Sequence, residues 1–207
     1  MLDSSWDHFA AIETIDWVAM LAGIIGVVLS IKERPSAWPF FILCYSAYIY
    51  IYLRSGYYAS AVMDVVFVGI AVYGWGKWSG LISSDENKKR SLKISKVPDR
   101  YWPFILVFVA VCTTAVGILL SQMNNARLPY LDAFAVSNAL VAQWMLSRKH
   151  LENWIFWIIS DIAYIGLFLS NGTWPSVFLF SVFILLACKG WHGWKQSLLR
   201  NALSPTV

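Results

Sequence analysis

Charged residues and cysteines are scarce in this sequence. Of 207 residues, 14% are charged and 58% are hydrophobic, and the mean hydropathy is +0.58. This balance excludes an ordinary soluble domain and is typical of a protein with several transmembrane helices in a lipid bilayer. Cys44, Cys112 and Cys188 fall in three separate apolar runs. Their spacing fits neither a disulfide framework nor a metal site, so we interpret them as small buried hydrophobic residues.

Sequence motifs for catalysis are absent as well. The sequence has no Walker loop, no nucleophile elbow and no histidine-rich metal spacing, which argues against an intramembrane enzyme. We therefore expect no catalytic residues, no cofactor and no metal. The first ten residues contain two aspartates and no Lys or Arg. A cleavable signal peptide is consequently not predicted.

Seven apolar runs dominate what is present. Each is long enough, at ~1.5 Å per residue, to cross most of a ~30 Å hydrocarbon layer. The connecting segments are short and polar apart from the loop 79–100. The sequence predicts an all-α integral membrane protein with seven transmembrane helices, formed by the runs 14–31, 37–54, 57–78, 101–121, 130–147, 153–170 and 174–195.

Nearly all basic residues fall on one side of the predicted bundle. Fourteen Lys and Arg residues lie at or near three inner connections and the C-terminus, with Lys88, Lys89 and Arg90 in the loop 79–100. The opposite side has only Arg54 and Arg127. Because basic residues accumulate on the cytoplasmic side of a membrane, we expect the N-terminus outside and the C-terminus in the cytoplasm. The basic charge is thereby explained without a nucleic-acid partner.

The two halves of the chain resemble each other. A shift of 116 residues aligns 16–78 with 132–194 without a gap, and 17 of the 63 pairs are identical. The fourth run has no counterpart. We therefore predict a 3+1+3 parallel repeat, with a first repeat at 12–80, a cytosolic loop and linker helix at 81–127, and a second repeat at 128–200. Both halves end in G-W-x-x-W, which we expect to hold the third helix of each half at the cytosolic interface.

The stretch from Glu152 to Trp174 carries the central candidate for a binding site. Asp161 lies in the middle of its apolar run, where an ionised carboxylate costs at least ~2.5–3.5 kcal/mol on insertion scales. Trp157 and Tyr164 lie four residues before and three residues after it, on the same helical face. An acid between two aromatic rings could bind a flat, cationic ligand. The alternative is an aspartate tied to a neighbouring helix for packing alone.

Other polar residues enter the two halves asymmetrically, as a site for an asymmetric ligand requires. Each also has a structural explanation, such as packing, capping or, for the lysine, extension to the lipid phosphates. Asn138 and Gln143 lie about 140° apart on one helix, so at most one faces a cavity, and Asn138 is preferred. The remaining predicted binding residues are Trp154, Asp64, Asn138 and Tyr48, and the predicted gating residues are Asp16, Asp132 and Lys189.

Duplication of three-helix bundles favours transport, because a site between two similar bundles can open alternately to each side of the membrane. A duplicated membrane scaffold is the structural alternative. A receptor or passive subunit that binds a ligand without translocating it is the alternative of a different class.

The residues resemble those of the PnuC family of bacterial vitamin transporters. The resemblance rests on R-K-x-x-E-N-W-x-x-W-x-x-x-D, from Arg148 to Asp161, on the closing G-W-x-x-W, and on Tyr58–Ser60 followed by Y-G-W-x-x-W at 73–78. It covers nearly the whole chain. It implies a fold similar to the SWEET sugar transporters, a homotrimer in the bacterial inner membrane, and facilitated diffusion of a vitamin that cytosolic phosphorylation then traps.

The substrate implied by the resemblance is a B vitamin. Nicotinamide riboside members carry amides at several pocket positions, which correspond here to Cys44, Asp64, Asp161 and Lys189. Carboxylates favour a ligand that presents donors and positive charge, whereas a carboxamide prefers side-chain amides. The chain is therefore expected to be most similar to the thiamine branch, PnuT. Nicotinamide riboside and riboflavin remain alternatives.

Overall fold

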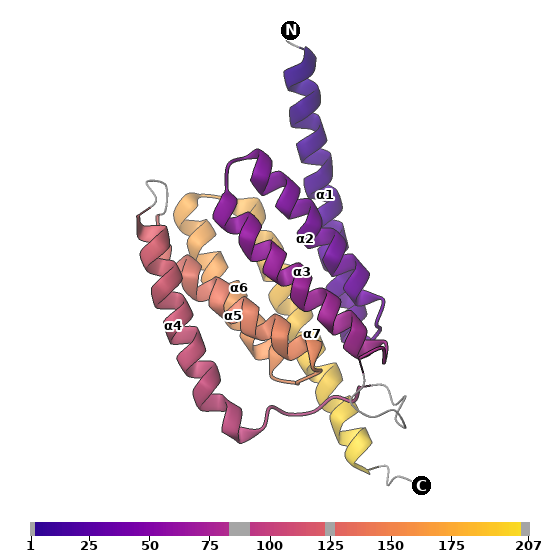
Figure 1. Ribbon diagram of the computed structural model, residues 1–207. Coiled ribbons are helices and arrows are strands. Elements are labelled where there is room, and N and C mark those ends of the chain that lie inside the picture. The colour runs from indigo at the N-terminus through magenta and orange to yellow at the C-terminus, as the bar shows by residue number, and fades with distance from the viewer. Residues whose placement is uncertain (1–2, 83–91, 123–126, 204–207) are drawn as a thin grey trace. The chain divides into compact units, whose positions relative to one another are not determined.

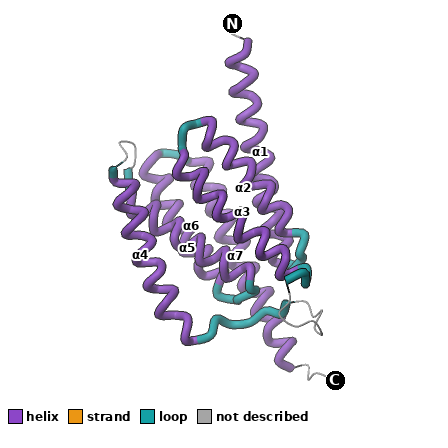
Figure 2. The backbone as a smooth tube through the Cα atoms, viewed as in Figure 1, coloured by secondary structure: helices purple, strands orange, loops and turns teal. Residues whose placement is uncertain are grey.

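Seven α-helices make up nearly all of the described chain (Figures 1 and 2). This computed structural model describes residues 3–82, 92–122 and 127–203, without the side chains of 3–12, 59 and 202. The basic residues Lys88, Lys89 and Arg90 lie outside these ranges. The helices are α1 (Asp3–Ile31), α2 (Ala37–Arg54), α3 (Tyr58–Trp78), α4 (Trp102–Ser121), α5 (Pro129–Ser147), α6 (Asn153–Asn171) and α7 (Trp174–Leu203), and a short 3₁₀ turn, η1 (Asp99–Tyr101), precedes α4. The predicted all-α fold class is confirmed.

The helices match the predicted apolar runs, and two of them extend further. Within α1, α3, α6 and α7, and in the span 99–121 that contains α4, the described residues are long and apolar enough to cross a membrane. The other two, α2 and α5, carry more polar side chains along their length. α7 continues past the predicted end at 195 to Leu203, because the residues after Lys195 are mostly good helix formers with no Gly or Pro to stop them.

The chain divides into two compact units, residues 1–91 and residues 92–207. In the first unit α2 packs against both α1 and α3. In the second unit α5 packs against α4 and α6, and α6 also packs against α7. The middle helix of each three-helix repeat, α2 or α6, therefore contacts both of its neighbours.

The two units share the geometry of their turns, as the predicted repeat requires. Gly56 and Gly172, which are paired by the repeat, have positive φ angles of 77° and 71° just after α2 and α6. Only glycine adopts this conformation without strain, and it closes both helices. Glu33 and Lys149, also paired, have φ angles of 56° and 54°. The internal repeat thus extends to unusual backbone conformations.

The glycine and the last tryptophan of each G-W-x-x-W motif pack inside their unit, whereas Trp75 is exposed, and anchoring of the motifs at the cytosolic interface stays a prediction. A Cβ atom on Gly190 would lie 2.5 Å from the Trp154 ring, and one on Gly74 would lie 2.4 Å from the Trp38 ring. Glycine is needed because each indole lies directly against the backbone of the third helix. The last tryptophans of the motifs, Trp78 and Trp194, are buried. The sequence pattern did not distinguish this close packing from an interfacial aromatic belt.

Candidate functional site

Asp161 lies near the middle of α6 and is 4% exposed. Its helix is held against α5 by the Ser160 hydroxyl, which donates to the Ala135 carbonyl oxygen at 2.9 Å. Within the part of the chain that the structure describes, no hydrogen bond or ion pair of the Asp161 carboxylate is found. A buried carboxylate without a partner is costly unless a ligand compensates it. This observation favours the binding interpretation over packing alone.

Tyr164 is part of an aromatic cluster between α6 and α7. Its ring lies 4.9 Å from Phe180 and 6.1 Å from Phe168, measured between ring centroids. Phe180 also contacts Phe168 and Phe183. The cluster fixes the tyrosine ring one helical turn from Asp161. An aromatic ring and an acid are therefore presented by the same part of α6.

Trp157 packs against the apolar cluster that holds the second unit together. The cluster consists of Val97, Ile105, Val141, Ala142, Met145 and Phe156, with Trp102, Val109, Trp144 and Trp157 against it. Trp157 itself is only partly buried. Its ring is thus supported from the side of the cluster while part of its surface stays accessible, as a stacking ring requires.

Trp154 occupies a different environment, although it is also a predicted binding residue. It is 2% exposed and packs edge to face on Trp194. Trp38, its counterpart in the first unit, packs on Trp78 in the same way. Helix packing accounts for this placement, and a role for Trp154 in binding remains a prediction.

The structure separates the two amides of α5 more clearly than helical spacing does. The Asn138 amide donates to the Phe134 carbonyl of its own helix at 2.8 Å. Gln143 is fully buried, and neither its amide nitrogen nor its amide oxygen has a hydrogen-bond partner among the described residues. Helical spacing left one of the two amides facing a cavity, and Asn138 was the predicted one. The sequence feature that could have drawn attention to Gln143 is its pairing with the apolar Val27 in the repeat.

The first unit has a polar cluster of its own between α2 and α3. Asp64 lies close enough to Cys44 and Tyr45 for electrostatic interaction, and its Oδ2 atom is buried without a partner among the described residues. Asp16 on α1 lies close enough to Tyr48 for electrostatic interaction. The Tyr45 ring of α2 stacks on Phe67 of α3 at 5.1 Å, which is the contact of a packing residue.

Acids and aromatic residues exchange places between the two units. The repeat pairs Tyr45 with Asp161 on the middle helices, and Asp64 with Phe180 on the third helices. Each unit consequently has one acid and one aromatic ring at these two positions, in opposite arrangement. This explains how a duplicated bundle can build two chemically different faces.

The three predicted gating residues lie in different structural settings. Asp16 lies well inside α1, which starts at Asp3, so the capping explanation is wrong for Asp16, and it is also wrong for Asp132 because another residue caps α5. Asp132 lies in the first turn of α5, whose N-cap is Leu128, where a carboxylate favours the positive end of the helix dipole. Lys189 is exposed, consistent with a side chain that extends to the lipid phosphates. A gating role for these three remains a prediction.

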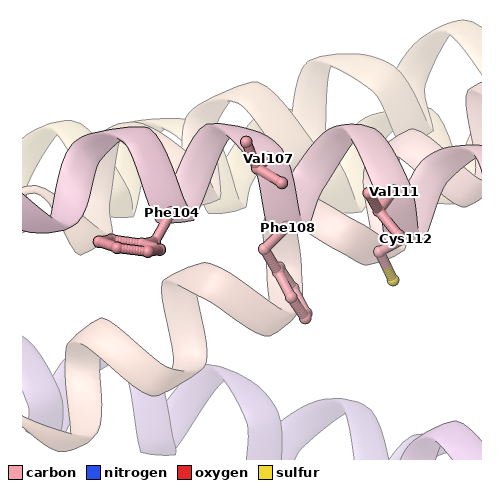
Figure 3. A pocket seen from close by; sticks show the side chains of 5 residues that line it. All are labelled: Phe104, Val107, Phe108, Val111 and Cys112. Carbon is pink, nitrogen blue, oxygen red and sulfur yellow. The ribbon is translucent and has the colours of Figure 1, made fainter.

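A shallow pocket follows α4, and it is unsuited to a polar ligand. Figure 3 shows its lining on successive turns of the helix, formed by Phe104, Val107, Phe108, Val111 and Cys112. None of these side chains can orient a charged or hydrogen-bonding vitamin. In a transmembrane helix such a surface is suited to lipid tails.

Comparisons with known proteins agree with this architecture. Residues 13–196 match the family model described as nicotinamide mononucleotide transporter. The chain belongs to this family. The nicotinamide riboside transporter PnuC of Escherichia coli is 23% identical over 88% of this chain and 85% of its own length. The riboflavin/roseoflavin transporter RibM of Streptomyces davaonensis is 25% identical over 87% and 85%, respectively.

The fold is also found in a solved structure. The crystal structure of the vitamin B3 transporter PnuC has a TM-score of 0.70 to this chain at 22% identity, and the match covers 96% of this chain and 88% of that one. The predicted seven-helix PnuC-like fold is thereby confirmed. Membership in this family makes the chain a multi-pass membrane protein of a transporter family.

Proposed function

We propose that this chain is a facilitated-diffusion transporter of a cationic B vitamin, with nicotinamide riboside as the first candidate. The family and the names of the relatives support a vitamin substrate, and several of them are named for nicotinamide riboside. They favour this vitamin over thiamine, which the sequence alone placed first. Residence in the bacterial inner membrane with the N-terminus outside, a homotrimer, and trapping by cytosolic phosphorylation are parts of the same proposal.

The observation that carries the proposal is the buried carboxylate of Asp161, which has no protein partner in the described chain. Nicotinamide riboside contains a flat pyridinium ring with a positive charge. Such a ring can stack on an aromatic side chain while a carboxylate balances its charge. Trp157 and Tyr164 are placed on the same helix, one turn on either side of the acid.

Thiamine is the second candidate, because the same carboxylate favours it. Its thiazolium ring is positively charged and its aminopyrimidine donates hydrogen bonds, which a carboxylate accepts. Riboflavin has no positive charge. Riboflavin is included in the binding test because one relative is named for it. A carboxylate without a partner has no positive charge to balance in this vitamin.

Binding of the three vitamins to purified protein in detergent, measured by calorimetry, tests the substrate. We expect nicotinamide riboside to bind most tightly, and Asp161→Asn to weaken its binding by about 1–3 kcal/mol. Asp99→Asn is the matched control, because Asp99 is exposed in the turn before α4. Unchanged binding by Asp161→Asn, or selective binding of riboflavin, would refute the proposal.

Uptake into liposomes tests transport against the receptor alternative. Purified protein should equilibrate the bound vitamin across the membrane without ATP and without an ion gradient. Binding without flux would make the chain a receptor. Stimulation by an imposed proton gradient would replace facilitated diffusion by coupled transport.

A further inference from the structure

The segment 92–98, here called the strap, is bound to the turn between α5 and α6. The Ser95 amide donates to the Lys149 carbonyl at 3.0 Å, and the Leu151 amide donates to the Ser95 carbonyl at 2.9 Å. The Ser95 hydroxyl lies 3.1 Å from Nδ1 of His150. The strap is thus attached through both the backbone N–H and the backbone C=O of Ser95, and all of these contacts lie within the second unit.

Glu152 adds a side-chain contact to this attachment. Its Oε2 atom accepts a hydrogen bond from the Val97 amide at 3.0 Å, and both residues are buried. Glu152 is also the N-cap residue of α6, yet its side chain makes no capping hydrogen bond to that helix. The Glu152 carboxylate therefore binds the strap and does not cap α6.

Val97 links this hydrogen bond to the candidate site. Its side chain belongs to the apolar cluster that contains Phe156, and Trp157 packs against that cluster. A residue whose amide is held by Glu152 consequently forms part of the support for Trp157. From these contacts we propose that Glu152 is a positioning residue, which holds the strap so that Val97 fixes the ring of Trp157 for the substrate.

This inference rests on the proposed function in one respect, namely that Trp157 contacts a vitamin. It also accounts for a conspicuous part of the sequence. Arg148 lies over the Trp144 ring at 5.0 Å, and the Asn153 amide donates to the His150 carbonyl at 2.6 Å. The R-K-x-x-E-N residues thus shape the turn and receive the strap.

The test compares Glu152→Ala with Glu152→Gln, which keeps an oxygen that can accept the Val97 amide. Protein labelled with 5-fluorotryptophan is studied by ¹⁹F NMR in detergent, with signals of Trp157 and Trp154 assigned from single substitutions. In Glu152→Ala we expect the Trp157 signal to shift or broaden and the Trp154 signal to stay. Glu152→Gln should resemble the unsubstituted protein, and binding of nicotinamide riboside should weaken three- to tenfold only in Glu152→Ala.

Three results would overturn the inference. These are an unchanged Trp157 signal in Glu152→Ala, equal shifts of the Trp154 and Trp157 signals, or a Glu152→Gln variant that behaves like Glu152→Ala. If Glu152→Ala does not fold, Val97→Ala removes the cluster contact and keeps the amide, and it should shift the Trp157 signal and leave the Trp154 signal in place. If no vitamin binds to the unsubstituted protein, the proposed function fails while the NMR comparison still decides whether Glu152 positions Trp157.

Discussion

Trp154 and Trp194 pack edge to face, with ring centroids 5.3 Å apart and an interplanar angle of 84°. Trp38 and Trp78 of the first unit repeat this contact at 5.4 Å and 87°. In both units a glycine of the third helix lies against the first of the two rings. The contact therefore joins the middle and third helices of each repeat, and duplication has preserved it.

This packing predicts which glycines can be replaced. In Gly190→Ala the new methyl group would collide with the Trp154 ring, and in Gly74→Ala with the Trp38 ring. We expect each substitution to lower stability by about 1–3 kcal/mol, the usual cost of overpacking. The measurement is thermal unfolding in detergent.

Two other helical glycines provide matched controls. Gly193 and Gly69 would place a Cβ atom in open space, with no heavy atom within 4 Å. Their replacement by Ala should leave stability unchanged or raise it by up to ~1 kcal/mol, because Ala is the better helix former. Equal effects of Gly190→Ala and Gly193→Ala would contradict the packing that we describe.

A second prediction concerns the buried amide of Gln143. Because neither of its polar atoms has a partner among the described residues, Gln143→Met should raise stability by about 1–3 kcal/mol. Ser160→Ala should have the opposite effect, since it removes the hydrogen bond to Ala135 on the neighbouring helix. The measurement is thermal unfolding of both variants and of the unsubstituted protein in detergent, without substrate. A loss of stability in Gln143→Met would indicate that the amide has a partner.

The third prediction is a pH dependence at the turn that holds the strap. Burial, with a smaller contribution from the charge of Arg148, lowers the pKa of His150. The unfolded chain therefore binds a proton at a higher pH than the folded protein does. Stability is fully present above the ordinary histidine pKa of ~6.5 and is lost as the pH falls below it. The measurement is the melting temperature between pH 5 and pH 7.5.

His150→Gln is the control for this effect, because Gln does not titrate. The melting temperature of this variant should fall less on acidification than that of the unsubstituted protein. Among the described residues, the His150 ring lies 3.1 Å from the Ser95 hydroxyl, packs near the Trp144 ring and is affected by the charge of Arg148. Identical pH profiles for the two proteins would show that another group is responsible.

Apolar length was sufficient to predict the seven helices, because a helix that crosses a bilayer needs about 20 mostly apolar residues, and internal repetition was sufficient to group six of them into two repeats. The repeat even paired the residues with positive φ, Gly56 with Gly172 and Glu33 with Lys149. What it could not supply was side-chain contact. The spacing of G-W-x-x-W is the same whether its glycine faces lipid or a tryptophan of the neighbouring helix, and only the structure separates these cases.

The candidate site was predictable in part for a similar reason. An acid in an apolar helix identifies Asp161 and Asp64 without coordinates, since burying a charge is costly wherever the helix lies. The strap could not be predicted, because its contact with Glu152 joins residues 55 positions apart through a backbone amide. Every residue except proline has a backbone N–H, so the residue type at a position does not reveal that its N–H binds a distant side chain.

The last prediction joins stability to binding at the two buried acids. Asp161 has no partner in the described chain, and one oxygen of Asp64 is buried without one. Replacing either by Asn should raise the melting temperature of the empty protein, because an unpaired carboxylate is costly to bury. Asp161→Asn should at the same time weaken binding of a cationic vitamin, the trade-off expected where a site is kept at the expense of stability. Asp99→Asn should change neither quantity. Lower stability of both Asn variants would show that each carboxylate is already compensated within the protein and needs no cationic ligand.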